Sequence, residues 1–510
     1  MKNIKQIFAL LLAVAMCFSF TACKKSSDGT ESGSGLSYGV SEDTNAGDGT
    51  GSGGDTANNN ESAANGGGAS GNTSAATQGG SSNNKNKDFG GKTVTIIYEY
   101  QPSDKKGIDP SRDRELDRIA EIQKKYNVKI VQKKGASNYH ESNVASITAG
   151  KPVGDIIKLN GNKNYDYIKA GLCADFNSAI KETGININAS HYLPLNQQYY
   201  NVNGKQYGIS LLLPQESDAN ALWFYNKDIL SEVGYSANYI NDLYKSGNWT
   251  WAEATKLFAA VQKKNANGTV ERYALGCAYA YNTVISLALN NNTKIGSVDK
   301  AGNPIANLNT PAVREVLQQF YDWGAVNKYI APSESDAVSS MFKKGEVFIY
   351  TTNSGGAKNA YNSGINFGVV LPPKGPRASK NVSMVRTGNT YIVPVTYQAN
   401  TSMYLTILDA LYAPYSDASA EDILKADNIQ YFSDVDSWNI FKAAAYDSSI
   451  RVADDFYAFN LEWANPAFGT VCLNLMKGTL TPATMVEKYN DQYQALLDDK
   501  FNGFKLTGVK

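Results

Sequence analysis

The sequence predicts an α/β fold built around parallel strands, and two observations support it. Strand-like and helix-like segments alternate from residue 93 to residue 159 in the order β-α-β-α-β, which is typical of a parallel sheet. The stretch Asn201–Leu230 then places a polar bend between two apolar runs and ends at the start of a helix. It predicts a crossing of the backbone between two α/β lobes, while an ordinary strand–loop–strand within one sheet is the open alternative.

The first five elements follow one another closely. Strands are expected at Thr93–Tyr98, Val128–Gln132 and Asp155–Leu159, which are short apolar runs bounded by turn residues. Helices are expected from Asp109-Pro110, where proline suits the first turn, and over Tyr139–Ala149. In parallel sheets of this kind ligands bind beyond the carboxyl ends of the strands. The residues that follow the first and third strands are therefore candidate ligand contacts.

The central stretch contains its own turn and strand signals. Asn203-Gly204 predicts a turn, and a strand is expected over Gln206–Leu213 until Pro214, which has no N–H to donate. Ala221–Tyr225 predicts a second, aromatic strand, and Asn226 is placed as the N-cap of a helix. The first crossing between lobes would then fall in the polar bend between the two strands.

The second half of the chain continues the mixed pattern. Thr250 and Glu253 form a capping box at the start of a helix. Val347–Tyr350 is expected to be a strand, and long amphipathic helices are expected over Thr401–Tyr412 and Thr481–Asp499.

Composition excludes some classes of partner. The chain has 510 residues, enough for two or three domains. Its 48 basic residues equal its 48 acidic residues, so no excess of positive charge predicts binding to nucleic acid. Five cysteines are present, and the three in the folded part, Cys173, Cys277 and Cys472, are odd in number and widely spaced. We expect buried free thiols rather than a disulfide framework.

Residues 1–22 are typical of a lipoprotein signal peptide. A positively charged start precedes the apolar run Ile7–Phe20, which is too short to span a bilayer, since a spanning helix takes roughly 20 residues. The following Thr21-Ala22-Cys23 completes a sequence that resembles the bacterial lipobox, with Phe20 in place of the usual Leu or Val. We expect acylation of Cys23, palmitate included, to anchor the protein at the outer face of the cytoplasmic membrane. A plain signal peptide with Cys23 unmodified is the alternative.

Residues 23–87 predict a lipidated cysteine followed by a flexible tether. The segment from Ser26 consists almost entirely of Gly, Ser, Asn, Thr, Ala and Asp, which cannot bury enough apolar surface to fold. A coil of about 60 residues has an end-to-end distance on the order of 40–45 Å. Gly49–Gly54 matches G-x-G-x-x-G, but neither a strand before it nor a helix after it is expected, so no dinucleotide site is predicted.

An ordered series of short motifs resembles one family. These are Gly204–Gly208 (GK-x-YG), Tyr225–Asp228 (YNKD), Thr250–Glu253 (TW-x-E), Phe342–Ile349 (F-x-x-GE-x-A-M), Phe367–Pro376 (FGV-x-x-x-P-x-GP) and Gly478–Pro482 (G-x-x-TP). Together they resemble the family 1 extracellular solute-binding proteins, the substrate-binding lipoproteins of ABC importers. The resemblance covers residues 89–505 and implies a type II periplasmic-binding-protein fold, in which two Rossmann-like α/β lobes face each other across a cleft and are joined by a multi-crossing hinge.

The resemblance also implies domain boundaries and a function. Lobe I is expected to comprise residues 88–213 plus about 372–414, and lobe II residues 214–371 plus about 415–510. It implies a monomer without cofactor or metal that captures a sugar, an oligosaccharide in particular, and delivers it to ABC permease subunits. A peptide, amino acid or uronate is the alternative solute. The family's tryptophan after the "GE" strand is missing from Asn353–Gly356, so a maltose-like site is not expected.

A sugar site needs hydrogen-bonding groups and flat aromatic surfaces. The residues predicted to contact ligand from strand ends are Tyr98, Glu99, Tyr100, Asn160, Trp223, Tyr279, Tyr281, Asn353 and Ser354. Loops that line the family's cleft add Arg386, Asn389 and Trp438. Core packing is the alternative for the aromatic residues, and since Trp223 and Tyr225 point to opposite faces of a strand, at most one of them should reach ligand.

The sequence does not predict an enzyme. It has only two histidines, His140 and His191, and contains no H-E-x-x-H, Walker A or calcium-loop motif. A glycosidase needs only two carboxylates, but nothing in the sequence singles out such a pair. A carbohydrate-active surface enzyme is therefore the less favoured alternative, as is an adhesin.

Overall fold

The computed structural model describes residues 87–509 except for 108, 161–162, 214–215, 386–388, 417 and 460. The predicted signal peptide, tether and lipidation site at Cys23 lie outside the described residues, as do Pro214 and Arg386. Within the described part, no helix has the length and apolarity that crossing a bilayer requires.

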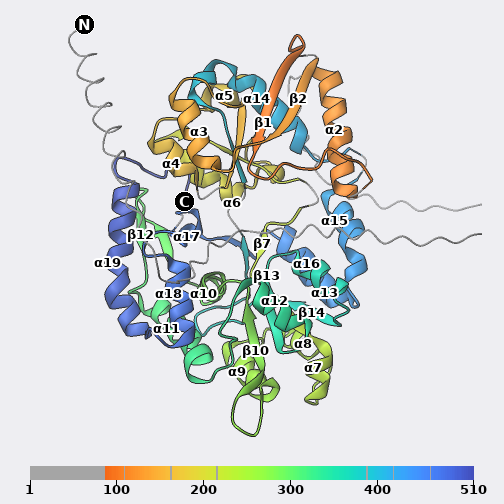
Figure 1. The fold of residues 1–510 in the computed structure, drawn as a ribbon, viewed down its shortest axis with the longest axis vertical. Helices are drawn as coiled ribbons and strands as arrows, with labels where there is room; N and C mark the ends of the chain where they lie inside the picture. The colour runs from red at the N-terminus through yellow and green to blue at the C-terminus, as the bar shows by residue number, and fades with distance from the viewer. Residues whose placement is uncertain are drawn as a thin grey trace, which may run out of the picture. The chain divides into compact units, whose positions relative to one another are not determined.

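Lobe I is built on a five-stranded sheet in the order β2-β1-β3-β16-β6 (Figure 1). Its strands are β1 (Lys92–Tyr98), β2 (Val128–Lys134), β3 (Ile156–Asn160), β6 (Ile209–Ser210) and β16 (Asn389–Ile392). Strands β1, β2 and β3 run parallel, as predicted, and β16 is antiparallel to both β3 and β6. The helices of this lobe are α2 (Pro110–Tyr126), α3 (Tyr139–Thr148), α4 (Asn164–Lys169), α5 (Asn177–Thr183), α6 (Pro194–Gln197) and α14 (Thr401–Tyr412).

Helices cover both faces of this sheet. Val94, Ile96 and Ile156 are buried on the face that packs against α2, α5 and α14. Ile97 and Ile157 point to the opposite face and join a core that includes side chains of α3 and α4. Because successive residues of a strand point to opposite faces, the continuous apolar runs of β1 and β3 follow from burial on both sides.

The strand predicted over Gln206–Leu213 is wrong in its extent. The structure has two short pieces instead: β5 (Lys205–Gln206), which pairs with β4 (Asn201–Val202), and β6, which pairs with β16. Gly208 lies between them, and a Cβ atom there would come 2.4 Å from Cγ2 of Thr390. Only glycine fits at this close approach. The chain then pairs with β16 over the two residues of β6.

Lobe II is built on a second five-stranded sheet in the order β14-β8-β13-β10-β9. Its strands are β8 (Leu222–Asn226), β9 (Lys263–Lys264), β10 (Val270–Cys277), β13 (Val347–Thr352) and β14 (Phe367–Val370). Strand β10 is parallel to β13, and β8 is antiparallel to its neighbours. The helices are α7 (Lys227–Glu232), α8 (Tyr239–Lys245), α9 (Trp251–Val261), α10 (Ala280–Leu289), α11 (Pro311–Tyr321), α12 (Ser335–Lys343), α13 (Gly356–Asn362), α15 (Ala420–Asn428), α16 (Val435–Tyr446), α17 (Asp455–Ala458), α18 (Phe468–Lys477) and α19 (Pro482–Lys500).

The helix starts predicted in this half are confirmed. The side chain of Asn226 accepts hydrogen bonds from the backbone N–H groups of Asp228 and Ile229 at the start of α7. Thr250 accepts from Glu253 N at the start of α9. Both caps satisfy N–H groups that have no partner within the helix.

A separate three-stranded sheet is formed by short strands from distant parts of the chain. It contains β7 (Ala219–Asn220), β15 (Ser383–Val385) and β17 (Arg451–Ala453) in the order β17-β15-β7. Strand β7 directly precedes β8 of lobe II, and β15 is followed after three residues by β16 of lobe I. Asp218, which is 7% exposed, forms an ion pair with Arg451 beside β7.

The segment that follows α19 connects lobe II to lobe I, and we call residues 501–509 the C-terminal clasp. Asn203 N donates to Lys505 O at 2.8 Å, and Thr507 N donates to Asn201 O at 3.0 Å, both across to the β4–β5 hairpin. Leu506 N donates to Gly302 O at 3.0 Å, in the turn between β11 (Gly296–Val298) and β12 (Pro304–Ala306). Backbone hydrogen bonds thus join the clasp to a hairpin of each lobe.

The buried carboxyl of Asp454 should make stability depend on pH. Burial, together with the neighbouring Asp455, raises the pKa of Asp454 to about 7, although the carboxyl accepts the backbone N–H groups of Phe456 and Tyr457. A carboxyl whose pKa is raised above its usual 3.8 in the folded state contributes stability at low pH that is lost as the pH rises toward 7.

We therefore expect Asp454→Asn, which keeps the helix cap without the charge, to stabilise the protein more at pH 8 than at pH 5. The difference should be on the order of 2 kcal/mol, since one pKa unit corresponds to about 1.4 kcal/mol. Urea unfolding at both pH values measures it, with the exposed N-cap substitution Asp109→Asn as control. An equal effect of Asp454→Asn at the two pH values would contradict the raised pKa.

The three cysteines of the folded part are buried free thiols, as expected. Burial raises the pKa of Cys277 to about 12 and the pKa of Cys472 well above its usual value. The thiolate, which is the reactive form, is thus suppressed.

Candidate ligand-binding site

A pocket of about 180 Å³ lies in lobe I at the carboxyl ends of β1 and β3, beside the chain that leaves β6. It is lined by Tyr98, Pro102, Asp109, Ser111, Arg112, Glu115, Lys158, Leu211, Leu213, Glu216, Asn389, Tyr391 and Tyr412. Its volume is below the roughly 300–1,000 Å³ typical of pockets that enclose a drug-sized ligand. The pocket therefore suits a small solute or one unit of a larger one.

The floor of the pocket is a row of three side chains from neighbouring strands. Tyr98 ends β1, Lys158 lies on β3, and Tyr391 is the register partner of Lys158 on β16. The Nζ atom of Lys158 lies 5.3 Å from the ring centroid of Tyr98 and 5.8 Å from that of Tyr391. A cation held between two aromatic rings is stabilised by their negative faces, so the rings keep the ammonium group at the pocket.

A hydrogen-bonded network under helix α2 fixes the tyrosine at one end of this row. Arg112 Nη1 contacts Glu115 Oε2 at 2.5 Å, and Arg112 Nη2 donates to Gln132 Oε1 at 2.6 Å. Gln132 Nε2 in turn donates to the hydroxyl of Tyr98 at 2.8 Å and to Glu115 Oε1 at 3.2 Å. Within this network Arg112 and Glu115 neutralise each other, and Gln132 orients Tyr98.

Burial changes the protonation behaviour of the row. It lowers the pKa of Lys158, against the opposite influence of Glu216 and Glu115, and it raises the pKa of Tyr98 and of Tyr391 far above their usual values. The tyrosine hydroxyls therefore stay protonated at neutral pH. Both side chains are almost fully buried, and their hydroxyls contact Gln132 and Tyr412. The half-buried Lys158 is therefore the member of the row that can donate to a solute.

Four predicted contacts of lobe I gather at this edge of the sheet. Tyr98 and Asn389 line the pocket, and Asn389 is the register partner of Asn160. Asn160 Nδ2 donates to Glu99 Oε2 at 3.2 Å. Tyr100 stands apart and is 60% exposed. Strand ends thus bring Tyr98, Glu99, Asn160 and Asn389 together, whereas Arg386 lies outside the described residues.

The predicted contacts of lobe II form two smaller groups. The rings of Tyr279 and Tyr281 lie 5.6 Å apart, and Trp463 packs edge-on against Tyr281 with 46% of its surface exposed. Asn353 accepts from Gly355 N at the start of α13, and Ser354 Oγ donates to Ser217 O at 3.3 Å. Ser354 therefore contacts the segment between β6 and β7.

Two predicted contacts lie in the core instead. Trp223 is fully buried, and its ring packs against Trp249, Phe258 and Trp323 at centroid distances of 6.2–6.4 Å. Trp438 is 5% exposed and lies among apolar and aromatic side chains of lobe II. Neither ring offers a solute a free surface in this structure, because β8 is buried on both of its faces and α16 packs its Trp438 side inward.

Sequence reasoning missed most of the pocket. Lys158, Glu216, Arg112 and Glu115 were not among the predicted contacts. One signal was present: Lys158 is the single charged residue in the apolar strand Ile156–Asn160, and a charge in a buried strand needs a reason.

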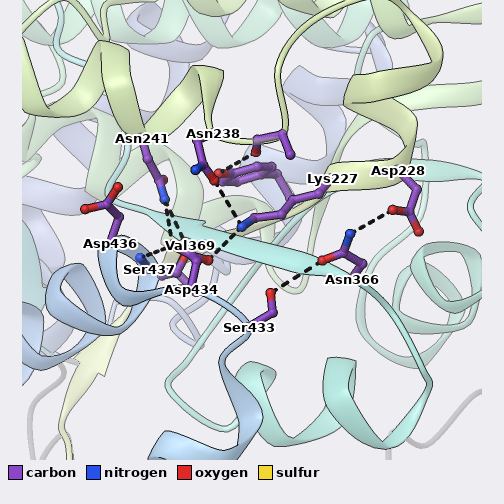
Figure 2. A network of polar contacts seen from close by, with 12 residues as sticks. Lys227, Asp228, Asn238, Asn241, Asn366, Val369, Ser433, Asp434, Asp436 and Ser437 are labelled. Carbon is purple, nitrogen blue, oxygen red and sulfur yellow. Dashed lines mark hydrogen bonds and ion pairs between the residues drawn. The ribbon is translucent and has the colours of Figure 1, made fainter.

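The YNKD motif proves to be a structural anchor. Figure 2 shows Lys227 directed at Asp434, and its Nζ atom lies 2.7 Å from Asp434 Oδ2 with only 5% of the lysine side chain exposed. Asn241 Nδ2 donates to the hydroxyl of Ser437 at 3.2 Å, which accepts from Val369 N at 3.0 Å. The network joins α7 and α8 to β14 and to the start of α16, far from the pocket.

Comparisons with known proteins agree with this architecture. The family model described as "Bacterial extracellular solute-binding protein" matches residues 117–461. The sn-glycerol-3-phosphate-binding periplasmic protein UgpB of Agrobacterium fabrum is 25% identical over 250 residues, which are 48% of this chain and 54% of that protein. UgpB of Brucella abortus is 23% identical over 252 residues, 49% of this chain and 55% of that protein. The chain thus spans about half the length of the curated relatives it matches.

Solved structures show the same fold at low identity. The sugar-binding protein MalE of Xanthomonas citri superposes with a TM-score of 0.57 at 16% identity, covering 80% of this chain and 98% of that one. UgpB of Mycobacterium tuberculosis, solved in complex with glycerophosphocholine, gives a TM-score of 0.58 at 14% identity, covering 80% and 99%. Because the family model covers more than half of the chain, this protein belongs to the bacterial extracellular solute-binding protein family, and its two α/β lobes have the fold of the periplasmic binding proteins.

Proposed function

We propose that this protein captures a sugar, an oligosaccharide in particular, between its lobes and delivers it to the permease of an ABC importer. The observation that carries the proposal is the lobe I pocket, which combines tyrosine rings, an ammonium group and a carboxylate at the carboxyl ends of parallel strands. Sugar-binding neighbours such as MalE of Xanthomonas citri support the same class of solute.

Glycerophosphate-type solutes are the second candidate. The curated relatives are named for binding sn-glycerol 3-phosphate, and one neighbour was solved with glycerophosphocholine. A peptide, amino acid or uronate stays a further alternative. No sugar cleavage is proposed, and release of reducing sugar from oligosaccharides by the purified protein would overturn a pure binding function.

The proposed mechanism is closure of the lobes around the solute. A solute that contacts both lobes only when they are closed shifts the equilibrium toward the closed form by its difference in affinity. A micromolar affinity corresponds to about −8 kcal/mol, which is enough for capture and closure together. The closed form would then dock on the permease.

We propose three crossings between the lobes: one between β6 and β7, one between β15 and β16, and one between α14 and α15. The second crossing is moved from the boundary expected near 372, because the intervening chain packs on lobe II: Trp249 Nε1 donates to Leu371 O, and Val382 N donates to Asn290 Oδ1. The remaining lobe boundaries are kept as proposed from the sequence.

The deciding experiment is a thermal-shift screen of the protein without its signal peptide. Mono- and oligosaccharides are compared with glycerophosphates, uronates, amino acids and peptides, and hits are confirmed by calorimetric titration. Stabilisation by sugars supports the proposal, and stabilisation by another class alone would replace it.

Anchoring through Cys23 is proposed as well and is tested in cells. We expect wild-type protein to incorporate labelled palmitate and to sediment with membranes, and Cys23→Ala to lose both properties, because acyl chains supply the binding to the membrane. Ser26→Ala, in the adjoining segment, is the matched control. Sedimentation of the unlabelled Cys23→Ala protein with membranes would contradict the lipid anchor.

A further inference from the structure

The charges that line the lobe I pocket nearly cancel, and this limits the solutes that it can accept. Lys158 and Arg112 are its positive residues, and Asp109, Glu115 and Glu216 its negative ones. Asp109 is the exposed N-cap of α2 and accepts Ser111 N. The remaining four residues are two cations and two carboxylates.

Arg112, one of the two cations, already has partners within the protein. Arg112 uses Nη1 for Glu115, Nη2 for Gln132 and Nε for Ser103 O at 2.5 Å. Glu115 is likewise held by Arg112 and Gln132. This pair is therefore neutral as a unit.

The other two charged side chains have no such partners. Among the described residues, neither Lys158 nor Glu216 has an ion-pair partner within 4.0 Å, and the only hydrogen bond of the Glu216 carboxylate comes from Leu213 N at 3.2 Å. Glu216 lines the same pocket as Lys158, and its negative charge opposes the lowering of the lysine's pKa by burial. The pocket thus offers one free donor group and one free acceptor group.

We infer that this pocket is a subsite for one uncharged, hydroxyl-rich unit of the solute, an inference that rests on the proposed function. Lys158 would donate to the hydroxyls of this unit, and Glu216 would accept from them. A hydroxyl both donates and accepts, so one sugar unit can satisfy both groups. The rings of Tyr98 and Tyr391 are 3% and 1% exposed, and they hold Lys158 between them in the pocket.

The same arrangement disfavours an anionic group at this position. A phosphate or carboxylate would pair with Lys158 but would leave Glu216 facing a like charge, and Arg112 is already paired with Glu115. Glu216 is exposed and Lys158 half-buried, so solvent screens part of this repulsion. A phosphate-bearing solute should therefore bind about 10-fold more weakly than its uncharged counterpart.

The test compares solutes and two variants by calorimetric titration. The solutes are the neutral sugar that binds best, sn-glycerol 3-phosphate and glucuronate. The variants are Lys158→Met and Glu216→Gln, and their controls are the exposed residues Lys129→Met on β2 and Glu121→Gln on α2. Thermal unfolding without solute checks that each variant folds.

We expect wild type to prefer the neutral sugar, and Lys158→Met to lose about 100-fold in affinity for it. Glu216→Gln should bind the sugar more weakly but gain affinity for sn-glycerol 3-phosphate or glucuronate, because the repelling charge is gone. This gain remains measurable even where Lys158→Met does not fold. The controls should match wild type.

The outcomes separate the two proposals. Tight sugar binding that both variants leave unchanged overturns the subsite while the proposed function stands. Preference of wild type for the phosphate or the uronate over every neutral sugar overturns the subsite and points to an anionic solute. Absence of binding by every class defeats the proposed function itself, and the subsite with it.

Discussion

Asp434→Ala is expected to destabilise the protein by about 3–5 kcal/mol, because it removes the carboxylate that pairs with the buried ammonium group of Lys227. The two groups lie 2.7 Å apart, and the side chains are 5% and 16% exposed. Asp434 also accepts Ser437 N as the N-cap of α16, and loss of such a cap costs about 1 kcal/mol. Denaturant unfolding followed by circular dichroism measures the loss.

A matched control, Asp436, lies two residues further on, in the first turn of α16. Asp436 pairs with Lys245 at the same distance of 2.7 Å, but the lysine side chain is 50% exposed. Exposed ion pairs contribute about 0–1 kcal/mol, so Asp436→Ala should cost little. Equal losses for the two substitutions would show that burial does not decide the contribution of the Lys227–Asp434 pair.

The effect of Asp434→Ala should also depend on pH. Burial opposes ionisation of Asp434, but hydrogen bonds from Lys227 and Ser437 outweigh it and lower the pKa of the carboxyl below its usual 3.8. A lowered pKa contributes stability that is present above pH 4 and is lost as the pH falls through the folded-state pKa. The difference between Asp434→Ala and wild type should therefore shrink in strong acid.

Trp223→Ala is expected to cost about 3–5 kcal/mol of stability, as is typical when a large buried aromatic side chain is truncated. Trp223 is fully buried among Trp249, Phe258 and Trp323, and removal of the indole leaves a cavity that these rings cannot fill without shifting. Urea unfolding measures the loss, and solute titration below the unfolding transition measures binding.

Trp463→Ala is the comparison for this prediction, because Trp463 is 46% exposed. We expect it to change stability by less than about 1 kcal/mol. A stable Trp223→Ala protein with weakened solute binding would restore Trp223 as a ligand contact and contradict its role in the core.

The order of strands and helices was predictable because it depends on local signals. Apolar runs bounded by turn residues marked β1, β2 and β3, and the caps at Asn226 and Thr250 marked the helix starts of lobe II. The edge at which polar groups meet also followed, since parallel strands end together. For that reason Tyr98, Asn160 and Asn389 are close in the structure.

The sequence could not distinguish a core aromatic from a site aromatic. Leu222, Trp223, Phe224 and Tyr225 are all fully buried, so β8 shows no alternation from which one exposed face could be inferred. Tyr412 of α14 lines the pocket, and its hydroxyl contacts that of Tyr391 on β16. No short-range sequence pattern predicts this contact between distant elements. Arg112 and Glu115 have the i,i+3 spacing of an exposed helical pair, yet they are 9% and 8% exposed.

The C-terminal clasp has a consequence for how the chain is made. Val202 forms a β-bridge with Leu506, and Asn203 is bonded to Lys505 across 302 residues of sequence. The β4–β5 hairpin therefore stays without this partner until residues near 505 have been synthesised. Pairing over so long a loop is slow to form, so lobe I cannot be completed before lobe II. A chain synthesised from its N-terminus would pass through a stage in which the β4–β5 and β11–β12 hairpins both lack their contacts with the clasp.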